Sequence, residues 1–151
     1  MLIIGVVIAC GAMADEGKPT SPALSPGSKE LITPEELVKL LQSPESYKFV
    51  IIQVGFHRLY DQAHIPNSEY IGPASNASGL QQLRARVLDI KKKNTPIVLY
   101  CGCCPWDHCP NVKPAFEALQ EMGFTNVKVL YIADNFGANW VDKGYPTEGR
   151  R

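Results

Sequence analysis

The sequence predicts an α/β fold with a mostly parallel sheet and helices on both faces. Short apolar runs typical of buried strands alternate along the chain with segments that carry apolar residues at helical spacing. The run of residues 49–54 is almost wholly apolar, as expected of a strand covered on both faces. This alternation indicates right-handed crossovers between parallel strands. Ligands bind such sheets beyond the C-terminal ends of the strands, so a functional site is expected there.

The first folded elements are predicted to be a strand at Leu31-Ile32 and a helix over residues 34–42. Thr33 and Glu36 form a capping-box pattern before this helix, and Pro34 takes its first position. Further strands are predicted at residues 49–54, 69–71, 96–100 and 127–132. Further helices are predicted at residues 78–91, 112–122 and 136–141, and residues 55–66 are expected to form an irregular connection.

Length and charge indicate a single domain without affinity for nucleic acid. The chain has 151 residues, and residues 30–149 are predicted to form one domain with its own core. The 15 lysines and arginines balance the 15 aspartates and glutamates, so the formal charge is zero. A neutral chain of this kind has no field that would attract nucleic acid, which is excluded as a partner.

The N-terminal residues predict export. Residues 1–14 are expected to be a signal peptide, because residues 2–9 are apolar and Ala12-Met13-Ala14 matches a cleavage pattern. The protein is therefore expected in the periplasm or outside the cell. Residues 15–29 contain three prolines, three serines and two glycines, a composition that predicts a flexible linker. Alternatively, the run ending at Cys10 resembles a lipobox, and a lipid on Cys10 would be the only route to a membrane.

A cysteine-rich loop follows the strand predicted at residues 96–100. Cys101 is the first residue beyond that strand, and the loop continues with Gly102, Cys103, Cys104, Pro105, Trp106, Asp107, His108 and Cys109. Four cysteines so close together indicate thiol or metal chemistry. Asn111 is placed to cap the following helix, whose free amides favour negative charge in the loop. The pKa of Cys101 is therefore expected to be lowered, which makes it a candidate nucleophile.

Several segments, in this order, resemble the rhodanese family. They are Ile51–Val54, Tyr60–Pro66, Ile97–Cys101, Met122–Phe124, Val127–Leu130, and the closing run that contains Phe136, Trp140 and Gly144-Tyr145-Pro146. The resemblance implies a three-layer α/β/α fold with a five-stranded sheet. It also implies a sulfurtransferase in which Cys101 carries sulfane sulfur as a persulfide, from a small sulfur donor to an acceptor thiol, which can belong to a protein. No cofactor is required for that chemistry.

The sequence departs from the family pattern at the site. Gln53 and Gly55 stand where the family has aspartate and arginine, and the cysteine loop is longer than usual. Between Cys101 and Val112 there is no lysine or arginine, which argues against efficient use of an oxyanion such as thiosulfate. Related phosphatases have arginine six residues after the cysteine, where this chain has Asp107, so phosphate-ester chemistry is discounted.

The additional loop residues leave three hypotheses open. In the first, Cys103 or Cys104 attacks a persulfide on Cys101, releases sulfide and leaves a disulfide. In the second, Cys103, Cys104, His108 and Cys109 bind a soft metal ion, copper or zinc. In the third, the chain is a non-catalytic rhodanese-like module. His108 is either a proton shuttle or a loop residue bonded to the backbone.

Overall fold

The computed structural model describes residues 24–25 and 27–150. The predicted signal peptide, Cys10 and most of the predicted linker lie outside these residues. Within the part of the chain that is described, no helix has the length and apolar character needed to cross a membrane.

The centre of the molecule is a five-stranded sheet in the order β1-β5-β4-β2-β3, and every neighbouring pair of strands is parallel. The strands are β1 (Leu31–Ile32), β2 (Val50–Gln53), β3 (Glu69–Tyr70), β4 (Ile97–Tyr100) and β5 (Val127–Leu130). The central strand β4 is buried along its whole length, as its apolar sequence predicts. Gln53 pairs with Tyr100, so β2 and β4 end side by side. The predicted α/β class and five-stranded parallel sheet are confirmed.

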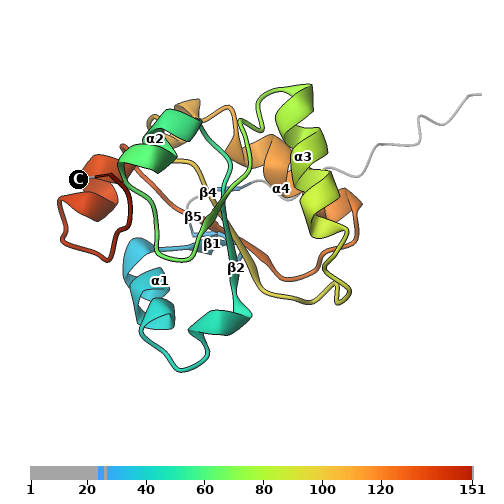
Figure 1. Ribbon diagram of the computed structural model, residues 1–151, viewed down its shortest axis with the longest axis horizontal. Coiled ribbons are helices and arrows are strands. Elements are labelled where there is room, and N and C mark those ends of the chain that lie inside the picture. The colour runs from blue at the N-terminus through green and yellow to red at the C-terminus, as the bar shows by residue number, and fades with distance from the viewer. Residues whose placement is uncertain (1–23, 26, 151) are drawn as a thin grey trace, which may run out of the picture.

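Helices cover both faces of the sheet and make three layers (Figure 1). One face packs against α1 (Pro34–Leu41) and the π-helical turn η3 (Gly137–Val141), through the fully buried Leu37 and Trp140. The other face packs against α3 (Ala77–Val87) and α4 (Val112–Glu121), through Leu83 and Phe116. Alternate residues of β4 enter the two cores, since successive side chains of a strand point to opposite faces.

Local sequence signals determine where the helices begin and end. The Thr33 hydroxyl accepts a hydrogen bond from Glu36 N at 3.2 Å, and the Glu36 carboxylate accepts one from Thr33 N at 2.8 Å. This reciprocal pair is the predicted capping box. After α4, Gly123 has φ +84°, a left-handed conformation that ends the helix.

The segment predicted as an irregular connection contains a helix, α2 (His57–Gln62). No side chain caps its start, and it carries no regular apolar stripe. Contacts outside the helix hold it instead, because the Tyr60 hydroxyl donates to Ser68 O at 2.5 Å and the Tyr60 ring stacks on His64 with ring centres 3.9 Å apart. Short 3₁₀ turns also form at η1 (Ser46–Lys48) and η2 (Trp106–His108).

Candidate functional site

The cysteine loop lies at the C-terminal end of β4, where the sheet topology predicts a site. Gln53, from the neighbouring end of β2, supports its start. The Gln53 amide donates to Cys101 O at 3.4 Å and accepts from Gly55 N at 3.2 Å, and the side chain is buried. Further along, the loop is joined to the segment after β5, because Trp106 N donates to Ala133 O at 3.0 Å.

Gly102 lets the chain turn back directly after Cys101. Its φ is +72°, a region that favours glycine, and a Cβ there would lie 2.6 Å from Phe136 Cβ. Gly102 O also accepts a hydrogen bond from Phe136 N at 3.0 Å. Any other residue would therefore be strained and would collide with the segment that leads into η3.

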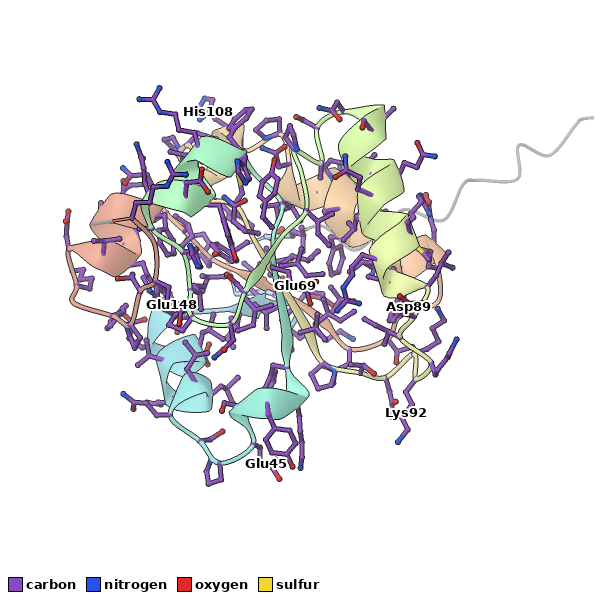
Figure 2. All side chains as sticks on the ribbon, viewed as in Figure 1. Glu45, Glu69, Asp89, Lys92, His108 and Glu148 are labelled. Carbon is purple, nitrogen blue, oxygen red and sulfur yellow. The ribbon has the colours of Figure 1, made fainter. Side chains whose placement is uncertain are left out.

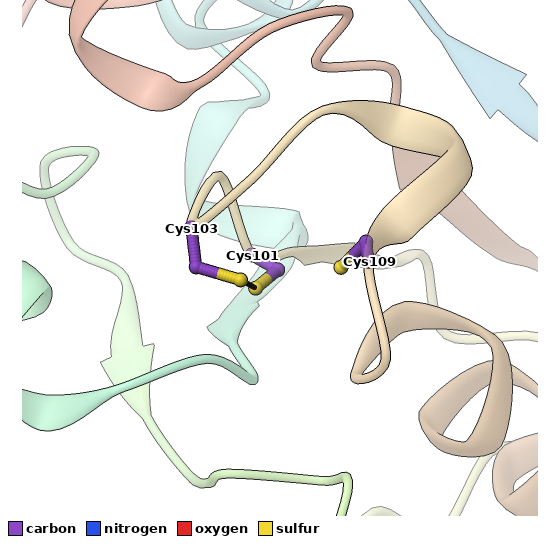
Figure 3. A group of neighbouring side chains, drawn as sticks. All are labelled: Cys101, Cys103 and Cys109. Atoms are coloured by element: carbon purple, nitrogen blue, oxygen red, sulfur yellow. Dashed lines mark hydrogen bonds between the residues drawn. The ribbon is translucent and has the colours of Figure 1, made fainter.

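The sulfur atoms of three loop cysteines lie close together. The Sγ atoms of Cys101, Cys103 and Cys109 all lie within 4.8 Å of one another (Figure 3). The Cys101 thiol donates a hydrogen bond to Cys103 Sγ at 3.1 Å. Cys104 lies beside this group without belonging to it: its sulfur contacts Cys103 Sγ at 3.1 Å and donates to His108 O at 3.4 Å. We call Cys101, Cys103 and Cys109 the sulfur triad.

Asn111 connects the triad to the rest of the fold. Its Nδ2 donates to Cys101 Sγ at 3.4 Å and to Cys103 Sγ at 3.8 Å. Its Oδ1 accepts from Ser75 N at 2.9 Å, and the whole residue is buried. Asn111 occupies the position before α4 that the sequence predicts, but its side chain makes no capping bond to the helix. The amide is directed towards the sulfur atoms instead.

The ionisation of the sulfur atoms differs from the sequence-based expectation. The pKa of Cys101 is raised, because its proton is held in hydrogen bonds to Cys103 and Cys109 and because the thiol is buried. The hydrogen bond from Cys101 lowers the pKa of Cys103 to about 5. The pKa of Cys109 is lowered to about 7, by a hydrogen bond from Cys101 and by the backbone amides of Asn111 and Val112. Burial raises the pKa of Cys104 to about 12.

The backbone amides at the start of α4 therefore lower the pKa of Cys109, and not that of Cys101 as expected. Cys103 is the thiol that ionises at the lowest pH. Solvent access also separates Cys101 from the other three loop cysteines. Cys101 is 2% exposed, whereas Cys103, Cys104 and Cys109 are partly exposed.

The cavity described beside the triad is small. A cavity of about 10 Å³, room for one water molecule at most, is lined by Cys101, Gly102, Cys104, Trp106, Cys109, Val112, Leu130 and Ile132. Two larger hollows, of about 540 and 450 Å³, lie elsewhere: one beside Glu30 and Val127, the other beside Leu41 and Pro66. A reagent therefore meets the site from the side of the partly exposed cysteines.

The structure brings together only part of the predicted metal-ligand set. Cys103 and Cys109 belong to the triad with Cys101, but Cys104 and His108 do not. His108 is exposed and lies at the outer edge of the molecule (Figure 2). Pro105 and Asp107 are also exposed, and the partly buried Trp106 packs against Tyr131 with ring centres 5.1 Å apart.

The sequence does not reveal that Gly55 lies against the sulfur of Cys101. A Cβ at this position would lie 2.8 Å from Cys101 Sγ, so the absence of a side chain makes room for the sulfur. The sequence marks Gly55 only as a departure from a family pattern, and no local signal links it to a cysteine so far along the chain.

The family model for the rhodanese-like domain matches residues 33–131. A search of the curated proteins finds no match. Among solved structures, a rhodanese-like domain from Anabaena has 21% sequence identity and a TM-score of 0.58, covering 82% of this chain and 81% of that one. A Bacillus halodurans protein has 19% identity and a TM-score of 0.59, with 79% and 76% covered. A rhodanese-related protein from Thermoplasma volcanium has 17% identity and a TM-score of 0.54, with 80% and 99% covered.

At these identities the structural likenesses establish the fold, and the family model adds a match over most of the chain. The matched segment includes the strands β2 to β5, Gln53 and the complete cysteine loop. The chain therefore belongs to the rhodanese-like domain family.

Proposed function

We propose that the protein is a sulfurtransferase in which sulfane sulfur enters on Cys103 and is carried as a persulfide on Cys101. The observation that supports this proposal is the 3.1 Å contact between the sulfur of the buried Cys101 and that of the partly exposed Cys103. By resemblance to the family, Cys101 is the expected sulfur carrier; it follows β4 directly, but it is buried. A second thiol in contact with it supplies the missing access.

In the first step, the Cys103 thiolate attacks the outer sulfur of a hydropersulfide or polysulfide donor. A new S–S bond forms on Cys103 while the donor's S–S bond breaks, and its electron pair leaves with the donor thiolate. Such donors suit the loop better than thiosulfate, because the segment from Cys101 to Val112 offers no side-chain cation for sulfonate oxygens.

In the second step, Cys101 attacks the outer sulfur now held on Cys103. The S–S bond on Cys103 breaks, and Cys103 keeps its electron pair. The Cys101 thiol already donates a hydrogen bond to Cys103 Sγ, so its proton passes to Cys103. The persulfide on Cys101 is then consumed when an acceptor thiol attacks its outer sulfur. Each step exchanges one S–S bond for another, so no external oxidant or reductant is needed.

Mass spectrometry of the reduced, metal-free chain after exposure to inorganic polysulfide tests the proposal. In the wild type, trapping should place one added sulfur atom on Cys101. Cys103→Ser should slow the loading of Cys101, and Cys101→Ser should leave the sulfur on Cys103. Cys104→Ser is the matched control and should load normally. Unchanged loading of Cys101 in Cys103→Ser would remove Cys103 as the point of entry.

Export belongs to the same proposal. It is supported by the apolar residues 2–9 and by the Ala12-Met13-Ala14 pattern, which predict a mature chain that begins at Asp15. Mass spectrometry of the N-terminus, on protein from its native host, tests it. A chain that retains residues 1–14 would contradict export.

A further inference from the structure

We propose that Cys101, Cys103 and Cys109 form a trigonal three-thiolate site for a single copper(I) ion. Among the residues that the structure describes, this is the one group of metal-binding side chains whose ligand atoms converge. The inference goes beyond sulfur transfer and stands on its own geometry.

The spacing of the three sulfur atoms is close to that required by a metal ion. Metal–thiolate bonds of about 2.3 Å in a trigonal arrangement separate the sulfur atoms by about 4 Å. The triad sulfurs all lie within 4.8 Å of one another. The Cys101–Cys103 pair, at 3.1 Å, must open towards that separation. Cys103 is partly exposed and can make this side-chain movement without disturbing the buried strand end.

Hydrogen-bond donors surround the sulfur atoms and compensate the negative charge of three thiolates. Asn111 Nδ2 faces both Cys101 and Cys103, at 3.4 and 3.8 Å. The backbone amides of Asn111 and Val112 donate to Cys109. Outer-shell donors of this kind orient metal ligands and stabilise their charged form. Asn111 is itself held by Ser75, so the donor is fixed before a metal ion arrives.

The ligand type and number favour copper(I) over zinc. Thiolates are soft ligands that select copper(I), whereas structural zinc sites are almost always four-coordinate. In the described part of the chain, no histidine or carboxylate joins the triad as a fourth ligand. Apolar residues close the inner side, since Val112, Leu130 and Ile132 line the small cavity beside Cys101 and Cys109. An apolar surrounding keeps water away from the ion.

Copper and sulfane sulfur would compete for the same atoms. Binding of copper(I) removes the remaining thiol protons and changes no oxidation state, because the ion enters and leaves as copper(I). A copper-loaded triad has no free thiolate with which to accept sulfane sulfur from a donor. Loading with copper should therefore block polysulfide labelling of Cys101, and a copper chelator should restore it.

The experiment titrates the full, reduced chain with copper(I) under anaerobic conditions, in competition with a chromophoric copper(I) chelator. One ion per chain is expected to bind. Loss of an outer-shell partner weakens metal binding about 10- to 100-fold. Loss of a ligand should weaken copper(I) binding by more than that in each of the variants Cys101→Ser, Cys103→Ser and Cys109→Ser. Cys104→Ser, which removes a neighbouring thiol outside the triad, should bind as the wild type does. Circular dichroism of each variant establishes that it has folded.

Two further measurements on the wild type do not depend on the variants. X-ray absorption should show three sulfur neighbours at about 2.3 Å. Bound copper should protect Cys103 and Cys109, the two partly exposed thiols of the triad, from alkylation, while the slow labelling of Cys104 stays as it is without copper; peptide mass spectrometry would show both. Two sulfur neighbours, equal protection of Cys104, or a preference for zinc with four ligands would each overturn the proposal. Sulfur transfer is assayed on metal-free protein, so either proposal can fail alone.

Discussion

The side-chain amide of Asn111 lies 3.4 Å from Cys101 Sγ, and its other end accepts a hydrogen bond from Ser75 N at 2.9 Å. One buried residue thus holds the sulfur group and the segment after β3 in a fixed relation. Asparagine before a helix normally caps it, so the Asn111 side chain gives up one favourable bond and makes three others, to Cys101, Cys103 and Ser75. The position of Asn111 is therefore tied to the sulfur chemistry as well as to the helix.

Asn111→Ala is expected to lower the free energy of unfolding by about 1–3 kcal/mol, because it leaves the Ser75 amide without its acceptor. Chemical denaturation measures this loss. Asn126→Ala is the matched control: its amide donates to Asn94 O at 3.3 Å in an exposed setting, and its loss should cost no more than about 0.5 kcal/mol. Equal costs for the two variants would show that the buried contacts of Asn111 add nothing.

Alkylation of Cys103 in the reduced, metal-free protein should follow its lowered pKa. Only the thiolate reacts, so the rate should be constant at neutral pH and fall as the pH drops through about 5. Rates of iodoacetamide labelling, resolved by peptide mass spectrometry, measure this profile. Cys104, with its pKa raised to about 12, should react slowly at neutral pH and serves as the internal reference.

Cys101→Ala provides the second arm of that experiment. It removes the donor whose hydrogen bond is the main reason for the lowered pKa of Cys103. The midpoint of the alkylation profile should therefore move upward, towards the ordinary thiol value of about 8.5. A midpoint that stays in place would mean that Cys101 does not stabilise the Cys103 thiolate.

Most of the sheet follows from the sequence, because burial on both faces imposes an apolar pattern that can be read locally. β2 and β4 show this directly, and the capping box before α1 marks the start of that helix. Helix α2 could not be found in the same way. Its stability depends on Tyr60, which contacts Ser68 and His64 only in the folded chain.

The density of cysteines predicts a thiol-rich site, but it does not predict which sulfur atoms meet. That selection depends on the left-handed turn at Gly102 and on the direction of the Asn111 side chain. Both are set by distant partners, Phe136 and Ser75. His108 is close to the cysteines in sequence and still lies outside the triad, because the turn at η2 leaves it exposed.

Gly102→Ala should destabilise the fold more than Gly123→Ala does. Both glycines have left-handed φ values, +72° and +84°, so each alanine carries a backbone strain of about 1–2 kcal/mol. The added Cβ at Gly102 would also collide with Phe136 at 2.6 Å, whereas at Gly123 nothing lies within 4 Å. Overpacking of this kind adds about 1–3 kcal/mol. Denaturation of the two variants measures the difference, and similar losses would contradict a close approach at Gly102.

Gly55→Ala should impair the site through a direct collision with sulfur. Its Cβ would lie 2.8 Å from Cys101 Sγ, which must move out of line with Cys103, so loading of Cys101 from polysulfide should fall. The variant should also lose about 1–3 kcal/mol of stability. In the Cys101→Ala background the sulfur is gone and the 3.1 Å approach to Gln53 Nε2 remains, so the same substitution should cost less than it does in the wild type. A double-mutant cycle from denaturation curves measures this coupling, and strictly additive costs would show that Gly55 does not make room for the sulfur.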